Sequence, residues 1–303
     1  MQDLRRMNST AGRTELNLLR ALIWVWLVLA LGSLSQAASL RIATWNMQWF
    51  PSGRQVALDP GVEAGNIRQA GELLSRIGAD ILVLQEVRSG QVADALAREC
   101  GPDYHTVICS QFKEGGATSW QQIVIVSRIQ AVAAWSDDWE TVGLTDPPRG
   151  FAFAAFDVEG KLVGAYGVHL KSNLRSEDPR TNQLNILKRE LAMKQLLQHR
   201  ERVAKRLGRE VGVWVVAGDY NTTLDDVRFA SEATLRSLID AGFSTKYESI
   251  DVADRITVPA YKSFPAATFD YILQSGAAWE SGAATIQSHL SDHRLVYATI
   301  TLP

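Results

Sequence analysis

The feature that most constrains the fold is a series of short apolar runs separated by polar turns. Some runs, such as residues 81–84 (ILVL) and 213–216 (VWVV), are continuously apolar, which is typical of strands buried on both faces. The last run alternates apolar and polar residues and suits a strand with one face in water. Strands are predicted at residues 40–45, 80–84, 104–109, 123–126, 151–156, 162–170, 213–217, 268–273 and 295–302.

Two longer segments carry the apolar spacing of helices. The first has apolar residues three and four apart, followed by Gly78 as a C-cap: Ile67, Ala70, Leu74 and Ile77. The second covers about residues 183–207 and ends before Gly208. Many strands with helices between them favour an α+β fold in which helices cover two packed sheets. A chain of 303 residues can form this as one domain.

The N-terminal residues 1–38 differ from the rest. Four arginines precede an apolar run over residues 21–34, and small residues follow it. This pattern predicts a secretory signal peptide, and so an exported protein, periplasmic or extracellular. The apolar run is shorter than the ~20 residues of a membrane span, and an uncleaved N-terminal membrane anchor is the alternative. Residues 39–303 then form the folded domain.

The sequence has two cysteines, Cys100 and Cys109. In an exported protein an even number of cysteines favours a disulfide, which would close a small local loop here. Two free, buried thiols are the alternative.

The charge is nearly balanced, with a formal net charge of -2, so no global basic field indicates nucleic acid. Basic residues are nevertheless concentrated in residues 171–209, which hold 11 Lys or Arg and 4 Asp or Glu. Two interpretations stay open: a solvated helix face, and a rim that attracts a polyanionic substrate.

Six short segments place polar side chains at or beside strand ends, where several strands can converge on one point. Carboxylate and amide oxygens suit a hard cation such as Mg²⁺, and histidines suit proton transfer. Each segment alone is a weak signal, because turn formers and caps use the same residues. The order of all six carries the weight: Asn46, Glu86, His169 with Lys171 and Asn173, Asp219 with Asn221, Asp270, and Asp292 with His293.

The ordered set resembles the signature of the endonuclease/exonuclease/phosphatase superfamily, the deoxyribonuclease-I-like group. It includes Gln85-Glu86, Gly218-Asp219-Tyr220-Asn221 and Ser291-Asp292-His293, and the match spans residues 40–302. The resemblance implies a four-layer α/β/β/α sandwich, with two packed mixed β-sheets flanked by helices. It also implies a site at one end of the sandwich that hydrolyses phosphate esters.

The resemblance implies a metal and a set of roles. Glu86 resembles the main Mg²⁺ ligand, with Asn46 beside it and Asp292 near the metal; Mn²⁺ and Ca²⁺ stay open as alternatives. His293 resembles the histidine that takes a proton from water or holds the phosphate, oriented by Asp270. Asp219 and Asn221 would position the water and the scissile phosphate. His169 would contact a phosphate oxygen or protonate the leaving group. Which group is the base, and whether one or two metals act, stays open.

Arg88 and Arg149 are candidates for phosphate contacts, with Lys171 and Asn173 in the same substrate-binding role. In one respect the chain departs from the nuclease branch, where a carboxylate orients the first histidine. The corresponding stretch, TSWQQIVIVS, offers Gln122 instead.

The preferred hypothesis is therefore an exported metal-dependent endonuclease acting on DNA or RNA, with no obligate protein partner. One alternative is a sphingomyelinase-like phospholipid head-group phosphodiesterase, for which the aromatic stretch at residues 135–139 (WSDDW) is a hint. A phosphatase of the same superfamily is another, and an inactive binding module is the most remote.

Overall fold

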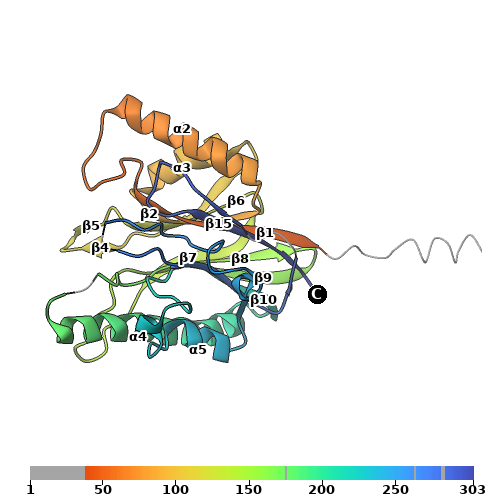
Figure 1. Cartoon of the computed structure of the whole chain (residues 1–303). Helices are drawn as coiled ribbons and strands as arrows, with labels where there is room; N and C mark the ends of the chain where they lie inside the picture. Colours follow the sequence, from red (N-terminus) through yellow and green to blue (C-terminus); the bar gives the residue numbers. More distant parts are fainter. Residues whose placement is uncertain (1–37, 175, 263, 281–283) are drawn as a thin grey trace, which may run out of the picture. The chain divides into compact units, whose positions relative to one another are not determined.

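The computed structural model describes residues 38–174, 176–262, 264–280 and 284–303 (Figure 1). The predicted signal peptide lies, but for its last residue, outside these residues. Among the helices in the described ranges, none is both long enough and apolar enough to cross a membrane.

Two large mixed sheets form the centre of the domain. The first has the strand order β13-β15-β1-β2-β6-β3, and β14 also pairs with β15. Strands β1 and β2 are parallel, and the other pairs are antiparallel. The strands of this sheet are β1 (Ser39–Phe50), β2 (Ile81–Val87), β3 (His105–Cys109), β6 (Gln122–Ser127), β13 (Ala278–Trp279), β14 (Ala284–Ile286) and β15 (Leu295–Thr301).

The second sheet has the order β11-β12-β10-β9-β8-β7, with β9 and β10 parallel. Its strands are β7 (Ala131–Asp138), β8 (Gly150–Val158), β9 (Lys161–His169), β10 (Val211–Asp219), β11 (Ser244–Thr245) and β12 (Asp270–Ser275). A separate small hairpin joins β4 (Lys113–Glu114) to β5 (Ala117–Thr118).

Helices cover the outer face of each sheet (Figure 1). Helices α2 (Pro60–Ile77) and α3 (Gly90–Cys100) lie over the first sheet, and α4 (Pro179–Arg206) and α5 (Thr234–Asp240) lie over the second. Two short 3-10 helices, η1 (Val227–Phe229) and η2 (Lys246–Ser249), complete the set. The predicted four-layer α/β/β/α sandwich is therefore confirmed.

Local sequence explains where α2 begins and ends. The Asp59 side chain accepts a hydrogen bond from the Gly61 amide, and Pro60 occupies the first turn, where its missing N–H costs nothing. Gly78 ends the helix with φ 62°, and its N–H bonds to the Leu74 carbonyl.

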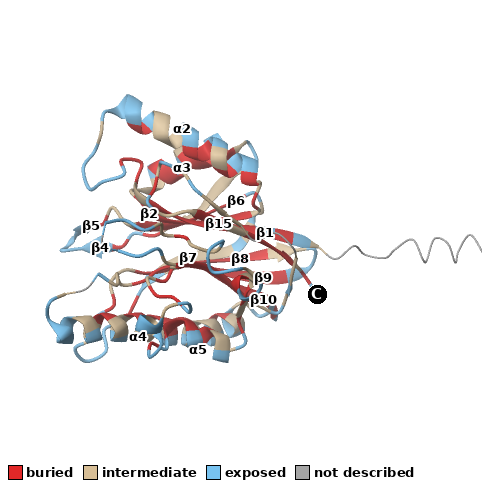
Figure 2. Cartoon of the chain, in the orientation of Figure 1, coloured by how far each residue is buried: buried red, intermediate tan, exposed pale blue. Residues whose placement is uncertain are grey.

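Side chains of β2 alternate between two apolar clusters. Ile81 and Val83 pack between the sheets, and Leu82 and Leu84 pack under α2 and α3. This is why residues 81–84 are continuously apolar. The buried strands between the exposed outer faces of the helices are visible in Figure 2. A Cβ on Gly167 would lie 2.8 Å from Ile123 and 2.9 Å from Val83, so β9 meets the other sheet closely at this point.

The predicted disulfide is wrong, because Cys100 and Cys109 are both free thiols. Cys100 is the last residue of α3, whereas Cys109 lies against Gly90, the first residue of that helix. An 11-residue helix is about 16 Å long, well beyond the ~7 Å between Cα atoms that a disulfide allows. Burial raises the pKa of Cys100 to about 12 and of Cys109 to about 11.

Candidate active site

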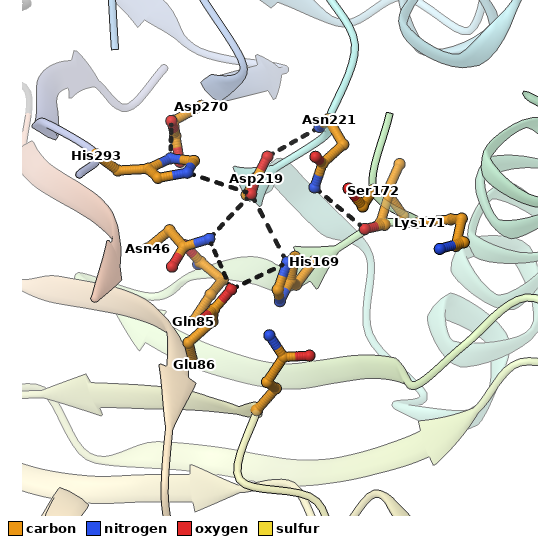
Figure 3. Close-up of polar contacts among 12 residues, drawn as sticks. Asn46, Gln85, Glu86, His169, Lys171, Ser172, Asp219, Asn221, Asp270 and His293 are labelled. Carbon is orange, nitrogen blue, oxygen red and sulfur yellow. Dashed lines mark hydrogen bonds and ion pairs between the residues drawn. The ribbon is translucent and has the colours of Figure 1, made fainter. Parts of the chain in front are cut away.

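Polar side chains from β1, β2, β9, β10 and β12 come together in one place (Figure 3). In the second sheet, Asp219 on β10 lies directly beside His169 on β9 and Asp270 on β12. In the first sheet, Asn46 on β1 pairs with Gln85, the residue before Glu86 on β2. His293 comes from the loop before β15. The predicted convergence of these side chains is what the structure shows.

Asn46 links the two sheets. Its Nδ2 donates to Asp219 Oδ2 (3.0 Å) and to Glu86 Oε1 (3.3 Å). Glu86 Oε2 accepts from the Trp49 amide (2.9 Å), and Asn46 Oδ1 accepts from the Gln48 amide (3.1 Å). These bonds hold both metal-ligand candidates, Asn46 and Glu86, in one orientation.

Strained backbone conformations concentrate around the cavity into which these side chains point. The register of β1 against β2 shifts between Asn46 and Phe50, and that of β2 against β6 shifts around Glu86. Seven non-glycine residues in the described ranges have positive φ, and five of them line the cavity. Such residues cost about 1–3 kcal/mol each and gather at functional sites, where bulges re-aim side chains. The five are Gln48, Trp49, Glu86, Arg149 and Asn221. The sequence interpretation missed Gln48 and Trp49, which follow Asn46 in the chain without any polar pattern of their own.

His293 and Asp270 form the predicted pair. His293 Nδ1 lies 2.8 Å from Asp270 Oδ2, and its Nε2 lies 3.9 Å from Asp219 Oδ2. Burial alone would lower the pKa of His293, but Asp270, Asp219 and Asp292 outweigh it and raise that pKa to about 10. Ser291 holds the loop in place, since its Oγ donates to the Asn46 carbonyl (2.7 Å) and accepts from the His293 amide (3.0 Å).

His169 is buried and faces two carboxylates. Its Nε2 lies 3.7 Å from both Glu86 Oε1 and Asp219 Oδ2. Burial, Arg149 and His293 together hold its pKa well below the usual value, so it is neutral at pH 7. Its Nδ1 has no hydrogen-bond partner within the described part of the chain.

The predicted orientation of His169 by Gln122 is wrong. The side-chain oxygen of Gln122, Oε1, accepts hydrogen bonds from Ser110 Oγ (2.7 Å) and from the backbone N–H of Phe112 (2.9 Å). It donates to the carbonyls of Phe112 and Ser119. All four bonds close the loop that contains β4 and β5, so the side chain has no bond left for a histidine.

The predicted phosphate contacts divide into two groups. Arg149, Lys171 and Asn173 line the cavity, and Arg88 does not. Arg88 instead makes a bidentate ion pair with Glu63 (2.7 and 2.6 Å). The hydrogen bonds from Arg88 lower the pKa of the Glu63 carboxyl to about 2. Arg149 donates to the carbonyls of His169 (3.0 Å) and Leu170 (2.8 Å) and therefore supports the end of β9.

The site opens into a cavity of about 1390 Å³. Asn46, Glu86, His169, Asp219, Asn221, Asp292 and His293 line it, whereas Asp270 lies behind His293 and is fully buried. Asp292 is exposed at its edge, where its amide donates to Gln48 Oε1 (3.1 Å). Asn221 donates its amide N–H to Asp219 Oδ1 (2.9 Å) and its Nδ2 to the Leu170 carbonyl (3.2 Å).

The donor set fits a divalent cation. Ligand atoms of Asp219, Asp270 and His293 all lie within 4.8 Å of one another. Asp270 Oδ1 is buried and has no hydrogen-bond partner among the described residues. Burial and the charge of Asp270 raise the pKa of Asp219 to about 7, although His293 and Asn46 oppose this. Asn46, Glu86 and Asp292 line the same cavity and add oxygen atoms of the kind that a hard divalent cation prefers.

Comparisons with known proteins agree with this geometry. A model of the Endonuclease/Exonuclease/phosphatase family matches residues 43–293. No curated protein matches the sequence.

Three solved structures illustrate the shared fold. An endonuclease/exonuclease/phosphatase family protein from Leptotrichia buccalis has a TM-score of 0.59 at 16% identity, over 87% of this chain and 100% of that chain. An endonuclease/exonuclease/phosphatase from Bacteroides vulgatus reaches 0.62 at 17% identity, over 88% and 100%. TDP2 from C. elegans reaches 0.58 at 16% identity, over 87% and 75%. Because the family model spans most of the sequence and the site lies inside the match, the chain belongs to the endonuclease/exonuclease/phosphatase family, whose members are generally divalent-metal-dependent phosphoester hydrolases.

Proposed function

We propose that the protein is an exported, divalent-metal-dependent phosphodiester hydrolase that cleaves nucleic acid as an endonuclease. The observation that carries the proposal is the placement of the His293–Asp270 pair beside Asp219, which also faces His169, at a cavity that Glu86, Arg149 and Lys171 line. Export rests on the sequence pattern of residues 1–38.

The residues of the chain account for the chemistry. Glu86, with Asn46 and Asp292, would hold the cation, of which Mg²⁺ is the expected one. When bound, the cation supplies positive charge to the phosphate oxygens.

The two histidines differ in charge. His293, held by Asp270, carries a proton at pH 7 and so donates a hydrogen bond to a phosphate oxygen. His169 is neutral and offers a hydrogen bond on the side of the leaving group. Asp219 Oδ2 lies between the two imidazoles, 3.7 Å from one Nε2 and 3.9 Å from the other, and so orients a water placed there.

The cavity favours a polyanion over a small ester. Arg149, Lys171 and Lys188 all line it, and none has a carboxylate within ion-pair distance in the described ranges. Unpaired basic residues beside the metal site suit the further phosphates of a nucleic acid strand. The basic segment at residues 171–209 therefore contributes at least Lys171 and Lys188 to the rim.

The hint of a membrane-binding aromatic stretch at residues 135–139 is not supported. Trp135 packs against Phe153 with ring centroids 4.6 Å apart, and Trp139 is only 5% exposed. Both tryptophans belong to the core or its edge, so they favour no phospholipid substrate.

A substrate panel tests the proposal. With Mg²⁺, the full-length protein should cleave nucleic acid, offered as plasmid DNA, single-stranded DNA and RNA, in preference to a sphingomyelin analogue or a phosphomonoester, and should lose activity in EDTA. Glu86→Ala and His293→Ala should each lower the rate at least about 100-fold. Glu72→Ala and His105→Ala remove a carboxylate and an imidazole that do not line the cavity, and should not change the rate. Hydrolysis of the sphingomyelin analogue or the phosphomonoester without cleavage of nucleic acid would contradict the proposed substrate.

A further inference from the structure

The segment before β12 forms a hairpin that carries two exposed aromatic side chains. The Tyr261 amide donates to the Phe264 carbonyl (3.0 Å), and the Phe264 amide donates back to Tyr261 (2.9 Å). Val258 and Ala267 pair in the same way below them. Tyr261 is 66% exposed and Phe264 is 54% exposed, and both line the active-site cavity. Neither side chain has a part in the chemistry described above.

The hairpin is anchored to the catalytic pair. Thr257, at its base, is fully buried, and its Oγ1 accepts from the amides of Phe269 (2.9 Å) and Asp270 (3.1 Å). The Thr257 carbonyl accepts from the amide of Arg294 (2.7 Å), the residue after His293. Because Thr257 bonds to the chain at Asp270 and at the residue after His293, the aromatic side chains have a defined position relative to the reaction.

An apolar surface continues from the hairpin into the cavity. Phe269 meets Phe229 edge to face, with ring centroids 6.0 Å apart, and Pro259 also lines the cavity. The same cavity presents the basic residues Arg149, Lys171 and Lys188. A ligand that satisfies both surfaces carries negative charge along one side and flat apolar rings along the other.

A nucleic acid strand with unpaired bases has this composition. Exposed aromatic side chains stack on bases of any identity, and basic residues follow the backbone. In a duplex the faces of the bases are covered by their neighbours, so Tyr261 and Phe264 would have nothing to stack on. A lipid surface is disfavoured because the two rings line a cavity that contains buried carboxylates and unpaired basic side chains.

We propose that Tyr261 and Phe264 stack on unpaired bases and make single-stranded nucleic acid the favoured substrate. This inference rests on the proposed function, since it identifies the substrate class of that same site.

Binding to three oligonucleotides tests the inference. Full-length protein in EDTA is titrated into a labelled single strand of about 12 nucleotides, its duplex, and an abasic strand of equal length. The wild-type protein should bind the single strand more tightly than the duplex or the abasic strand. The double variant Tyr261→Ala/Phe264→Ala should bind the single strand about tenfold more weakly and the abasic strand unchanged. Tyr261→Phe/Phe264→Tyr should retain the preference.

Val142→Ala/Leu144→Ala is the matched control. Both residues are exposed, at 55% and 94%, on a turn that does not line the cavity. The control variant should bind all three oligonucleotides as the wild-type protein does.

Two results would overturn the stacking. One is that the alanine double variant binds the single strand and the abasic strand equally more weakly than the wild-type protein does, or binds both unchanged. The other is unchanged oligonucleotide binding together with loss of binding to phosphatidylcholine vesicles, which would identify a membrane contact. Cleavage of nucleic acid with Mg²⁺ tests the proposed function separately. If the protein cleaves nucleic acid but binds the abasic strand as tightly as the normal single strand, the proposed function holds and the proposed stacking is wrong.

Discussion

The positive charge of His293 depends on the carboxylates that surround its imidazole. An imidazole removed from water normally loses its proton, and burial acts in that direction here. Asp270, which lies 2.8 Å away and is fully buried, contributes most to reversing this effect. The pair therefore couples the protonation of the active site to folding.

Replacing Asp270 with Asn should lower the pKa of His293 from about 10 by roughly 1–3 units. The folded-state pKa of His293 lies above its unfolded value of about 6.5. Its stabilisation is therefore fully present below pH 6.5 and is lost as the pH rises through 10. NMR titration of the imidazole in EDTA measures the pKa, and urea unfolding at pH 7.5 and pH 10 measures the stability. An unchanged His293 pKa in the variant would show that Asp270 does not control this proton.

At the scale of elements, one ion pair joins α4 to the segment before α5 and to the loop after β9. Arg189 donates to Glu232 through Nε (2.7 Å) and Nη2 (2.6 Å), and both side chains are at most 2% exposed. Arg189 Nη1 also donates to the Lys171 carbonyl (3.0 Å), and Thr234 Oγ1 donates to Glu232 (2.6 Å). The position of Lys171 at the cavity thus depends on a helix that contributes little to the chemistry.

Arg189→Met leaves the Glu232 carboxylate buried without its partner. We expect the free energy of unfolding to fall by about 3–5 kcal/mol, and Arg189→Met/Glu232→Leu to recover part of it. The matched exposed pair is Arg209–Asp157, at 48% and 35% side-chain exposure. Arg209→Met should leave the urea midpoint nearly unchanged. Equal shifts of the urea midpoint in Arg189→Met and Arg209→Met would show that the buried ion pair contributes no more to stability than the exposed one.

At the scale of the whole molecule, folding itself assembles the metal site. Asn46 on β1, Glu86 on β2 and Asp292 in the loop before β15 are far apart in the chain, so only the folded first sheet brings these three proposed ligands together. An unfolded chain has no such site. A cation bound to the native state should therefore stabilise the whole fold.

Saturating Mg²⁺ should raise the melting temperature of the full-length protein by roughly 5–10 °C over the value in EDTA. This estimate combines about 2.7 kcal/mol at a hundredfold excess over the dissociation constant with 2–4 °C per kcal/mol. Glu86→Gln should abolish most of the increase, and Glu72→Gln, on the exposed side of α2, should retain it. An equal increase in both variants would place the cation elsewhere.

The elements were largely predictable because apolar patterning is local. All nine predicted strands are present, and both predicted helices form, although α2 begins seven residues before Ile67. The prediction missed β7, an edge strand that is half exposed and so lacks a clear pattern. It also missed α5, which has seven residues and no side-chain N-cap, and α3, whose buried Val92 and Leu96 do show helical spacing.

The sequence by itself determined the layers and placed Glu86, His169, Asp219 and Asp270 at or beside strand ends, because burial and strand polarity depend on neighbours along the chain. Asn46, expected at the end of the first strand, lies inside β1, which continues to Phe50 after a shift in register. Only the tertiary structure decided what each polar side chain touches. Gln122 bonds within its own loop, Arg88 pairs with Glu63, and the two cysteines lie near opposite ends of α3. Hydrogen bonds and ion pairs act over about 3 Å, and which residues come that close depends on how the two sheets and their helices pack.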